Sequence, residues 1–154
     1  MYSHFKKLLL CFLLLTFCNI FVAQTVTNPF IKKLNGRLFF RDYRYVLEEI
    51  NKEIPLVHDN SLLSTLYLYK GKADLGLKSN KEAIKDFNAS LKYNNKCFEA
   101  LVLRSKGYFV LNDFANANKD INEAIKINGM FSDAFVVKGK LQILKLIFNW
   151  HWWI

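Results

Sequence analysis

The chain has 154 residues, a length that suits one domain or a short array of repeats. Lysine and arginine outnumber aspartate and glutamate by 22 to 13, but the basic residues alternate with acidic ones along the chain. This alternation argues against a nucleic-acid-binding protein, which gathers its positive charge on one stretch or one face.

The first 23 residues have the organisation of a secretory signal peptide. Lys6 and Lys7 form a short positively charged region, and an apolar run from Leu8 to Ala23 follows it. Because this run is short for a membrane span, we expect a signal that is cleaved after Ala23 rather than a retained membrane anchor. The protein would then be exported, to the periplasm or to the extracellular medium.

Cleavage would divide the cysteines of the chain. Cys11 and Cys18 would leave with the signal, so that Cys97 remains as the one cysteine of the mature protein. A single cysteine cannot form an internal disulfide, and packing alone must then hold the fold together. Cys18 loosely resembles the cysteine of a bacterial lipoprotein signal, but the bulky Phe17 before it argues against lipidation.

The segment ahead of Pro55 predicts two helices. The first would run from Pro29 to Phe40. The second carries apolar residues at spacings of four, at Val46, Ile50 and Ile54. Pro55 would end this second helix, and a polar turn follows it.

The second half of the sequence repeats itself with a period of 34 residues. Residues 67–72 align with residues 101–106. At the same offset, residues 81–88 align with residues 115–122, and a third copy begins at Phe135. A fixed period of this length indicates helical hairpins that stack on one another.

The residue types at these positions resemble the tetratricopeptide repeat (TPR) family. The family pattern asks for a bulky and a small residue in the first helix of a repeat, then a small, a bulky and another small residue in the second. One copy fills these positions with Tyr67, Gly71, Ala83, Phe87 and Ser90, and the next fills them with Leu101, Ser105, Ala117, Ile121 and Ala124. The third copy supplies Phe135 and Gly139 and then departs from the pattern, and the family's tryptophan and its proline after the second helix are missing.

The resemblance implies an all-α fold, a right-handed α-solenoid of antiparallel helix pairs. Residues 24–60 would form a degenerate first repeat, because Val46 corresponds to Ala83 at an offset of 37 residues. Residues 61–97 and residues 98–131 would each form a TPR repeat, and residues 132–154 a partial repeat with a Trp-rich tail.

Two kinds of polar contact are expected within the repeats. Ser79 and Glu82 form a capping box at the start of a helix, and Asp113 can cap the equivalent helix one period later. Oppositely charged residues also recur 16 residues apart, which predicts ion pairs between the two helices of a repeat, each worth at most about 1 kcal/mol if exposed. These pairs are Lys33 with Glu49, Lys70 with Asp86, and Arg104 with Asp120. We interpret them as contacts that stabilise the scaffold rather than as parts of a functional site.

A second set of lysines indicates a binding surface. The resemblance implies that first-helix residues line a concave groove, where lysines recur at the 34-residue period beside apolar residues. The predicted groove consists of Leu68, Lys72, Leu75, Val102, Lys106, Phe109, Val136 and Lys140. An apolar floor with a basic row suits a peptide or protein partner that carries acidic groups. The alternative is that the lysines merely solvate an exposed helix face.

Some ligands are not expected. The family's chaperone-tail receptors have polar and basic residues where this chain has Leu68 and Val102, which argues against that ligand class. Of the histidines, His4 lies in the signal, His58 in a turn and His151 in the tail, so no two form a metal pair. The sequence also lacks a glycine-rich phosphate loop, HExxH and GxSxG. We therefore expect neither an enzyme nor a cofactor or metal site, and no nucleic-acid partner.

The tail with Trp150, Trp152 and Trp153 does not follow the repeat. It could fold back over the exposed edge of the preceding helix, or its rings could enter a membrane interface. A third interpretation, which the loss of the pattern favours, is an altered or truncated reading frame. The alternative function is then a fragment of a longer TPR protein with no binding function of its own. Membrane contact would involve only the signal or this tail, and an exposed apolar edge predicts self-association.

Overall fold

The computed structural model describes residues 28–130 and 132–150. The predicted signal and the tail residues His151, Trp152 and Trp153 lie outside these described residues. Within them the chain is helical and has no strand, which confirms the all-α prediction. The elements are α2 (Pro29–Phe39), α3 (Tyr43–Glu53), a 3-10 turn (Ile54–Leu56), α4 (Asn60–Gly76), α5 (Asn80–Tyr93), α6 (Phe98–Val110), α7 (Phe114–Ile127) and α8 (Ser132–Trp150).

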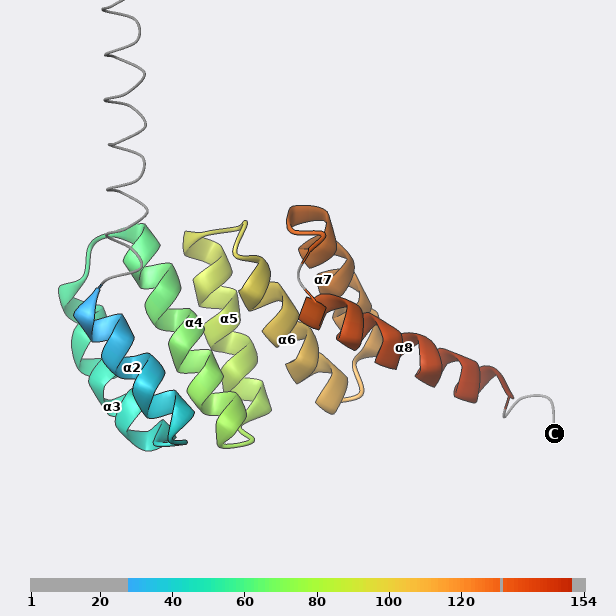
Figure 1. Cartoon of the computed structure of the whole chain (residues 1–154), viewed down its shortest axis with the longest axis horizontal. Helices are drawn as coiled ribbons and strands as arrows, with labels where there is room; N and C mark the ends of the chain where they lie inside the picture. The colour runs from blue at the N-terminus through green and yellow to red at the C-terminus, as the bar shows by residue number, and fades with distance from the viewer. Residues whose placement is uncertain (1–27, 131, 151–154) are drawn as a thin grey trace, which may run out of the picture.

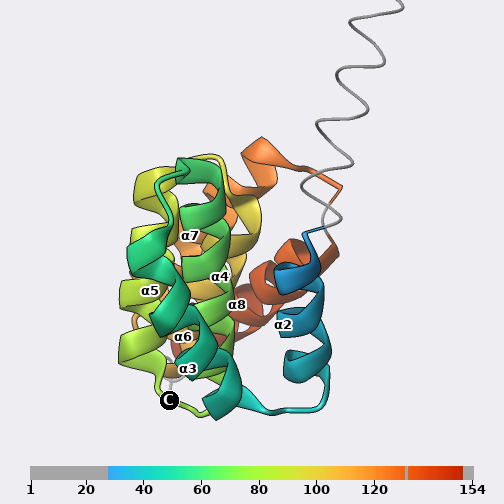
Figure 2. The ribbon, with the colours of Figure 1, turned by 90° about the vertical axis from the view of Figure 1, so that its left-hand side faces the viewer.

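The helices pack as antiparallel pairs that stand in a row, in the order of the chain (Figure 1). α2 pairs with α3, α4 with α5, and α6 with α7, while α8 packs on both α6 and α7. Viewed from the α2/α3 end of the row, α3 and α5 lie on one side and α2 and α8 on the other (Figure 2). This arrangement is the predicted right-handed α-solenoid. None of the helices in the described part of the chain is long and apolar enough to cross a membrane.

The turns between the paired helices reproduce the predicted offsets. Arg41, Lys78 and Asn112 have left-handed backbones, with φ of 59°, 62° and 61°, and they lie 37 and then 34 residues apart. In each turn the next residue donates its backbone N–H to a carbonyl five residues earlier, as from Ser79 to Asp74 at 2.9 Å. This hydrogen bond satisfies the last carbonyls of the first helix. The same turn therefore closes all three helix pairs, including the pair of α2 and α3.

Small residues let the helices of a pair approach closely. A methyl group on Gly71 would lie only 2.5 Å from the ring of Phe87, which is fully buried. Ala83 and Ala117, at the small positions of the second helices, are also fully buried. Val46, predicted to correspond to Ala83 in the degenerate first repeat, is equally inaccessible.

Helix capping agrees with one expectation and corrects another. The Asp113 side chain accepts a hydrogen bond from the backbone N–H of Asn116, as predicted. Ser79 stands at the start of α5, but its side chain makes no capping hydrogen bond, so the predicted capping box is wrong. Glu82 instead forms an ion pair with Lys85 at 2.9 Å, one turn further along the same helix.

The three predicted ion pairs within repeats are present. Lys33 Nζ lies 2.9 Å from Glu49, Lys70 Nζ lies 3.4 Å from Asp86, and Arg104 binds Asp120 through two nitrogens at 2.6 and 2.7 Å. Their burial differs, because the side chains of Lys33 and Glu49 are 47% and 22% exposed whereas those of Arg104 and Asp120 are 19% and 6% exposed. The limit of about 1 kcal/mol for exposed pairs therefore applies to the first pair and not to the last.

The middle pair contains a buried carboxyl group with an unusual protonation. The pKa of Asp86 is raised from 3.8 to about 7, mainly by burial and then by a hydrogen bond with Asp74, while the charge of Lys70 opposes the shift. Both Asp74 and Asp86 are buried. A proton on Asp86 would relieve the repulsion between the two carboxyl groups near neutral pH.

The first part of the tail, up to Trp150, belongs to α8. Residues 146–150 extend the helix to Trp150 without a turn. The interpretation in which the tail folds back does not apply to these residues. The other tail interpretations concern residues outside the described part of the chain.

Replacing Lys78 by glycine is expected to stabilise the protein by about 0.5–1 kcal/mol. The left-handed backbone at this position strains a residue with a Cβ atom, and glycine relieves that strain. Urea unfolding followed by circular dichroism measures the change. Lys119→Gly is the matched control, because Lys119 is an exposed interior residue of α7, and there the same replacement should cost about 1 kcal/mol. Destabilisation by Lys78→Gly would contradict the role assigned to the turn.

Asp86→Asn is expected to gain stability relative to the wild type as the pH rises from about 5 to about 8. The pKa of Asp86 is higher in the folded protein than in the unfolded chain, so the folded state holds this proton more tightly. That contribution is complete below about pH 3.8 and is lost as the pH rises to about 7. Asparagine is neutral at both pH values, so the variant does not lose this stabilising contribution as the pH rises.

The measurement is the free energy of unfolding in urea at both pH values. Asn118→Ala is the control, because Asn118 is exposed on α7 and carries no titratable group. Its difference from the wild type should be the same at both pH values. An equal difference for Asp86→Asn would refute the assignment of the proton to this buried pair.

Candidate functional site

The first helices α4, α6 and α8 form one face of the array, which we call the first-helix face. α4 contacts α6 and α6 contacts α8, while α4 and α6 also pack on their own second helices, α5 and α7. The predicted groove residues all come from these three helices. The first-helix face therefore carries all eight predicted groove residues.

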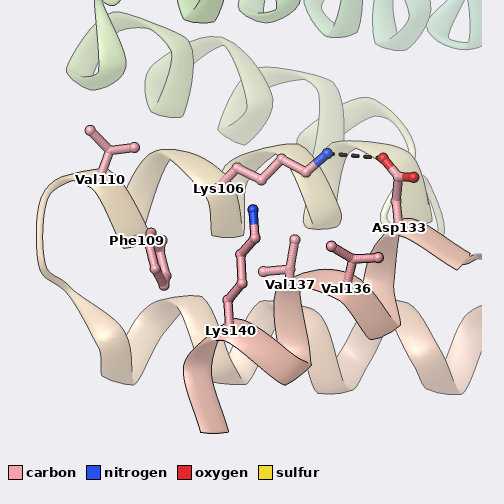
Figure 3. A pocket seen from close by; sticks show the side chains of 7 residues that line it. All are labelled: Lys106, Phe109, Val110, Asp133, Val136, Val137 and Lys140. Atoms are coloured by element: carbon pink, nitrogen blue, oxygen red, sulfur yellow. Dashed lines mark hydrogen bonds and ion pairs between the residues drawn. The ribbon is translucent and has the colours of Figure 1, made fainter. Parts of the chain in front are cut away.

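A pocket of about 330 Å³ opens on this face between α6 and α8. Its walls include Phe109 of α6 and Val136 of α8, with lysines at the rim (Figure 3). The lining residues are Lys106, Phe109, Val110, Asp133, Val136, Val137 and Lys140. The structure thus brings together four of the eight predicted groove residues, namely Lys106, Phe109, Val136 and Lys140.

The other four predicted residues lie outside this pocket. Leu68 is 6% exposed and packs with Ala83, Phe87 and Ala100, and Val102 is 1% exposed in the next core. Leu75 is half-buried against the cluster that contains Leu68. These apolar residues serve the cores between helices and present little surface to a partner.

The predicted lysine row is joined by acids that the sequence analysis missed. Lys72 Nζ lies 2.8 Å from Glu99, and Lys106 Nζ lies 2.9 Å from Asp133. Each acid stands in the first turn of the next first helix, so both pairs bridge successive repeats. The signal was available, because Glu99 and Asp133 are also 34 residues apart. Two of the three lysines therefore meet a carboxylate within the protein.

Lys72 is further held by an aromatic ring. Its Nζ lies 4.5 Å from the centre of the Tyr69 ring. Burial raises the pKa of Tyr69, and the charge of Glu99 adds to the shift. The phenol is therefore neutral at physiological pH, and Lys72 is held by a ring and a carboxylate rather than presented to solvent.

Lys140 differs from the other two lysines. It is exposed and rises from α8 into the pocket (Figure 3). Within residues 28–130 and 132–143, no carboxylate lies within ion-pair distance of its ammonium group. Lys140 thus carries a charge beside apolar walls, which include Val110 at 58% and Val136 at 57% exposure.

The described residues offer no evident place for a metal. No group of three histidine, cysteine, aspartate or glutamate residues converges among them. Cys97 stands at the start of α6, half-buried against an apolar cluster. The chemistry of the pocket is that of apolar contact and positive charge.

Comparison with known proteins identifies the fold. No protein-family model and no curated protein matches the sequence. Solved structures match as TPR domains. The TPR domain of Arabidopsis OM64 superposes with a TM-score of 0.67 at 20% identity, covering 72% of this chain and 89% of that one.

Two further structures extend the likeness. The second TPR domain of human RPAP3, solved with an HSP70 peptide, gives a TM-score of 0.65 at 19% identity over 72% of this chain and 90% of that one. The Hsp90 co-chaperone Cns1 from Saccharomyces cerevisiae gives 0.73 at 20% identity, over 82% of this chain and 41% of that one. At such identities the likeness establishes a TPR-like solenoid.

Proposed function

We propose that the protein is a TPR-like module that binds a peptide segment of another protein on its first-helix face. The observation that carries the proposal is the pocket between α6 and α8, which combines apolar walls with the uncompensated charge of Lys140. Solenoids of this kind present extended surfaces to partners. The TPR domain of RPAP3, for comparison, was solved in complex with a peptide.

The size and chemistry of the pocket suggest what the segment contains. A volume of about 330 Å³ lies at the lower end of the range for small-molecule sites, and suits one or two apolar side chains. Phe109 and Val136 would contact such a side chain. Lys140 would meet a carboxylate next to it, at a site partly shielded from water, where the attraction is stronger than in bulk solvent.

The proposed ligand differs from a chaperone tail. Chaperone-tail receptors of this family carry polar and basic residues at the positions that Leu68 and Val102 occupy here, and these two side chains are buried in the cores. Lys72 and Lys106 already pair with Glu99 and Asp133. We therefore propose an internal or terminal acidic segment that is recognised at α6 and α8 rather than along the whole row.

We also propose that the protein is exported. The support is the sequence of residues 1–23, with two lysines ahead of an apolar run and a small residue at Ala23. The partner would then be a protein or peptide of the periplasm, the envelope or the extracellular medium. The alternative function is a fragment of a longer TPR protein that binds nothing by itself.

Selection from a displayed peptide library tests the binding proposal. Enriched peptides should place an aspartate or glutamate within a few residues of a bulky apolar residue. Lys140→Glu should weaken the best peptide by roughly tenfold, about 1.4 kcal/mol, because it replaces attraction by repulsion. Isothermal titration calorimetry measures the affinity.

The matched control for that experiment is Lys119→Glu, which makes the same charge reversal on the exposed side of α7. It should leave the affinity unchanged. Enrichment without acidic residues, or equal effects of the two reversals, would count against the site. If no peptide is enriched at all, the fragment alternative is favoured.

Export makes a separate prediction about the N-terminus. When the whole chain is expressed in a bacterial host, the exported protein should begin at Gln24, because the signal would be removed after Ala23. Intact-mass spectrometry of the fraction released from the envelope measures this directly. A chain that keeps residues 1–23 and stays with the membrane would refute cleavage while leaving the binding proposal intact.

A further inference from the structure

In the described part of the chain, α8 has no second helix packed against it as α5 packs on α4 and α7 packs on α6. Its residues Phe135, Lys138 and Gly139 stand 34 residues after Leu101, Arg104 and Ser105. In a complete repeat these positions face the second helix. We call the three α8 residues the open α8 face.

The complete repeats show what normally covers these positions. The ring of Phe87 lies against Gly71, at 2.5 Å from where a methyl group would stand. Ser105, at the same position one period later, is fully buried, and so is Ile121 of the second helix opposite. Bulky apolar residues of second helices thus fill the notch left by a small residue.

The same positions on α8 are uncovered. Phe135 is 49% exposed, whereas its equivalent Leu101 is 5% exposed. Gly139 has no atom of another segment within 4 Å of where a Cβ would stand, in contrast to Gly71. The notch is present, and nothing in the described structure fills it.

The positive charge of Lys138 at this face also lacks an acidic partner among the described side chains. Lys70 and Arg104 each pair with an aspartate of the second helix, at 3.4 and 2.6 Å. Lys138 is the next member of that series, and no carboxylate among the described side chains lies within ion-pair distance of it. An acidic residue of a helix that docked here could therefore form an ion pair with Lys138.

The second helices α5 and α7 share a sequence pattern that matches this face. Each has a small residue, an acid three positions later, a bulky apolar residue next to the acid, and a further small residue three positions after that. The two sets are Ala83, Asp86, Phe87 and Ser90, and Ala117, Asp120, Ile121 and Ala124. The acid pairs with the lysine or arginine of the first helix, and in the first set Phe87 enters the notch at Gly71.

We propose that the open α8 face binds an amphipathic helix of a partner protein that carries this pattern. The partner's acid would pair with Lys138, and its bulky apolar residue would enter the notch at Gly139 and cover Phe135. The docked helix would lie on α8 as α5 lies on α4 and α7 on α6. Apolar burial would supply the affinity, and the ion pair would fix the register of the helix.

A second copy of the chain is a poorer occupant than a different protein. The bulky residues Phe87 and Ile121 are fully buried within their own repeats, and so is Ile50 of α3. Each described helix that carries a bulky apolar residue of this kind therefore already packs it inside its own repeat. A second copy would have to open one of its own repeats to donate a helix.

The open α8 face is separate from the pocket of the proposed function. Val136 and Lys140 line the pocket, whereas Lys138 and Gly139 do not. Side chains three or four positions apart share one side of a helix, so the two sets occupy neighbouring stripes of α8. Substitutions can therefore test one surface without removing the other.

The test uses the purified chain and a fluorescent peptide of residues 113–128, which contains the α7 pattern. A peptide of this length is only marginally helical alone, so its helicity should rise when the chain is added. Binding is measured by fluorescence anisotropy. We expect saturable binding that Gly139→Leu weakens by at least about tenfold, because leucine fills the notch; Gly139→Leu should fold, since the position is open.

A charge exchange tests the register. Lys138→Glu should weaken the peptide by several fold, and a peptide with Asp120→Lys should recover affinity for that variant and not for the wild type. Lys81→Glu is the matched control, since it makes the same reversal at an exposed residue of α5, outside both the open α8 face and the pocket, and it should leave this peptide's affinity unchanged.

Three outcomes would overturn the proposal. The first is that neither this peptide nor one of residues 79–94 binds. The second is binding that is insensitive to Gly139→Leu, as displacement of the chain's own α7 would be. The third is a concentration-dependent dimer, seen by sedimentation and abolished by Gly139→Leu, which would make a second copy the occupant.

Discussion

The close approach of two helices at a small residue determines how each repeat of this protein is built. The ring of Phe87 lies against Gly71 where any side chain would collide with it. At that separation Lys70 can reach Asp86 on the opposite helix. Each helix pair covers only one of its two sides in this way, so the next pair must cover the other. Val102 is an example, because it is buried in a core that α6 shares with α8 of the next repeat.

Ion pairs connect the helices in two directions, and the two sets have different consequences. The pair of Arg104 with Asp120 lies within a repeat and is largely shielded from water, so its geometry fixes how one helix sits on its partner. The pair of Lys106 with Asp133 bridges two repeats and is more exposed. It neutralises a lysine that would otherwise face a ligand, and it thereby restricts where the first-helix face can attract a negative charge.

Much of this structure could be predicted from the sequence, because a fixed period identifies equivalent positions. The helices and the pairing of Lys33 with Glu49 follow from residue type and spacing. The left-handed backbone at Lys78 does not, because lysine is not a residue type that favours it. The period marks Glu99 and Asp133 as equivalent acids, but their pairing with Lys72 and Lys106 could not be assigned from spacing alone, since it depends on the rotation between successive repeats. The proton held by Asp86 depends on burial beside another carboxyl group, which no spacing reveals.

Among the described side chains, the α8 members of both charge series have no carboxylate partner, and this asymmetry distinguishes α8 from α4 and α6. Lys138 continues the series within repeats, and Lys140 continues the series between repeats. The equivalent basic residues of α4 and α6 already form ion pairs inside the protein. Electrostatic attraction for an acidic partner is therefore concentrated at α8. Apolar surface is exposed at the same place, through Phe135 and Val136. Charge steers an encounter and apolar burial retains it, so the helix that combines both is where binding should be sought.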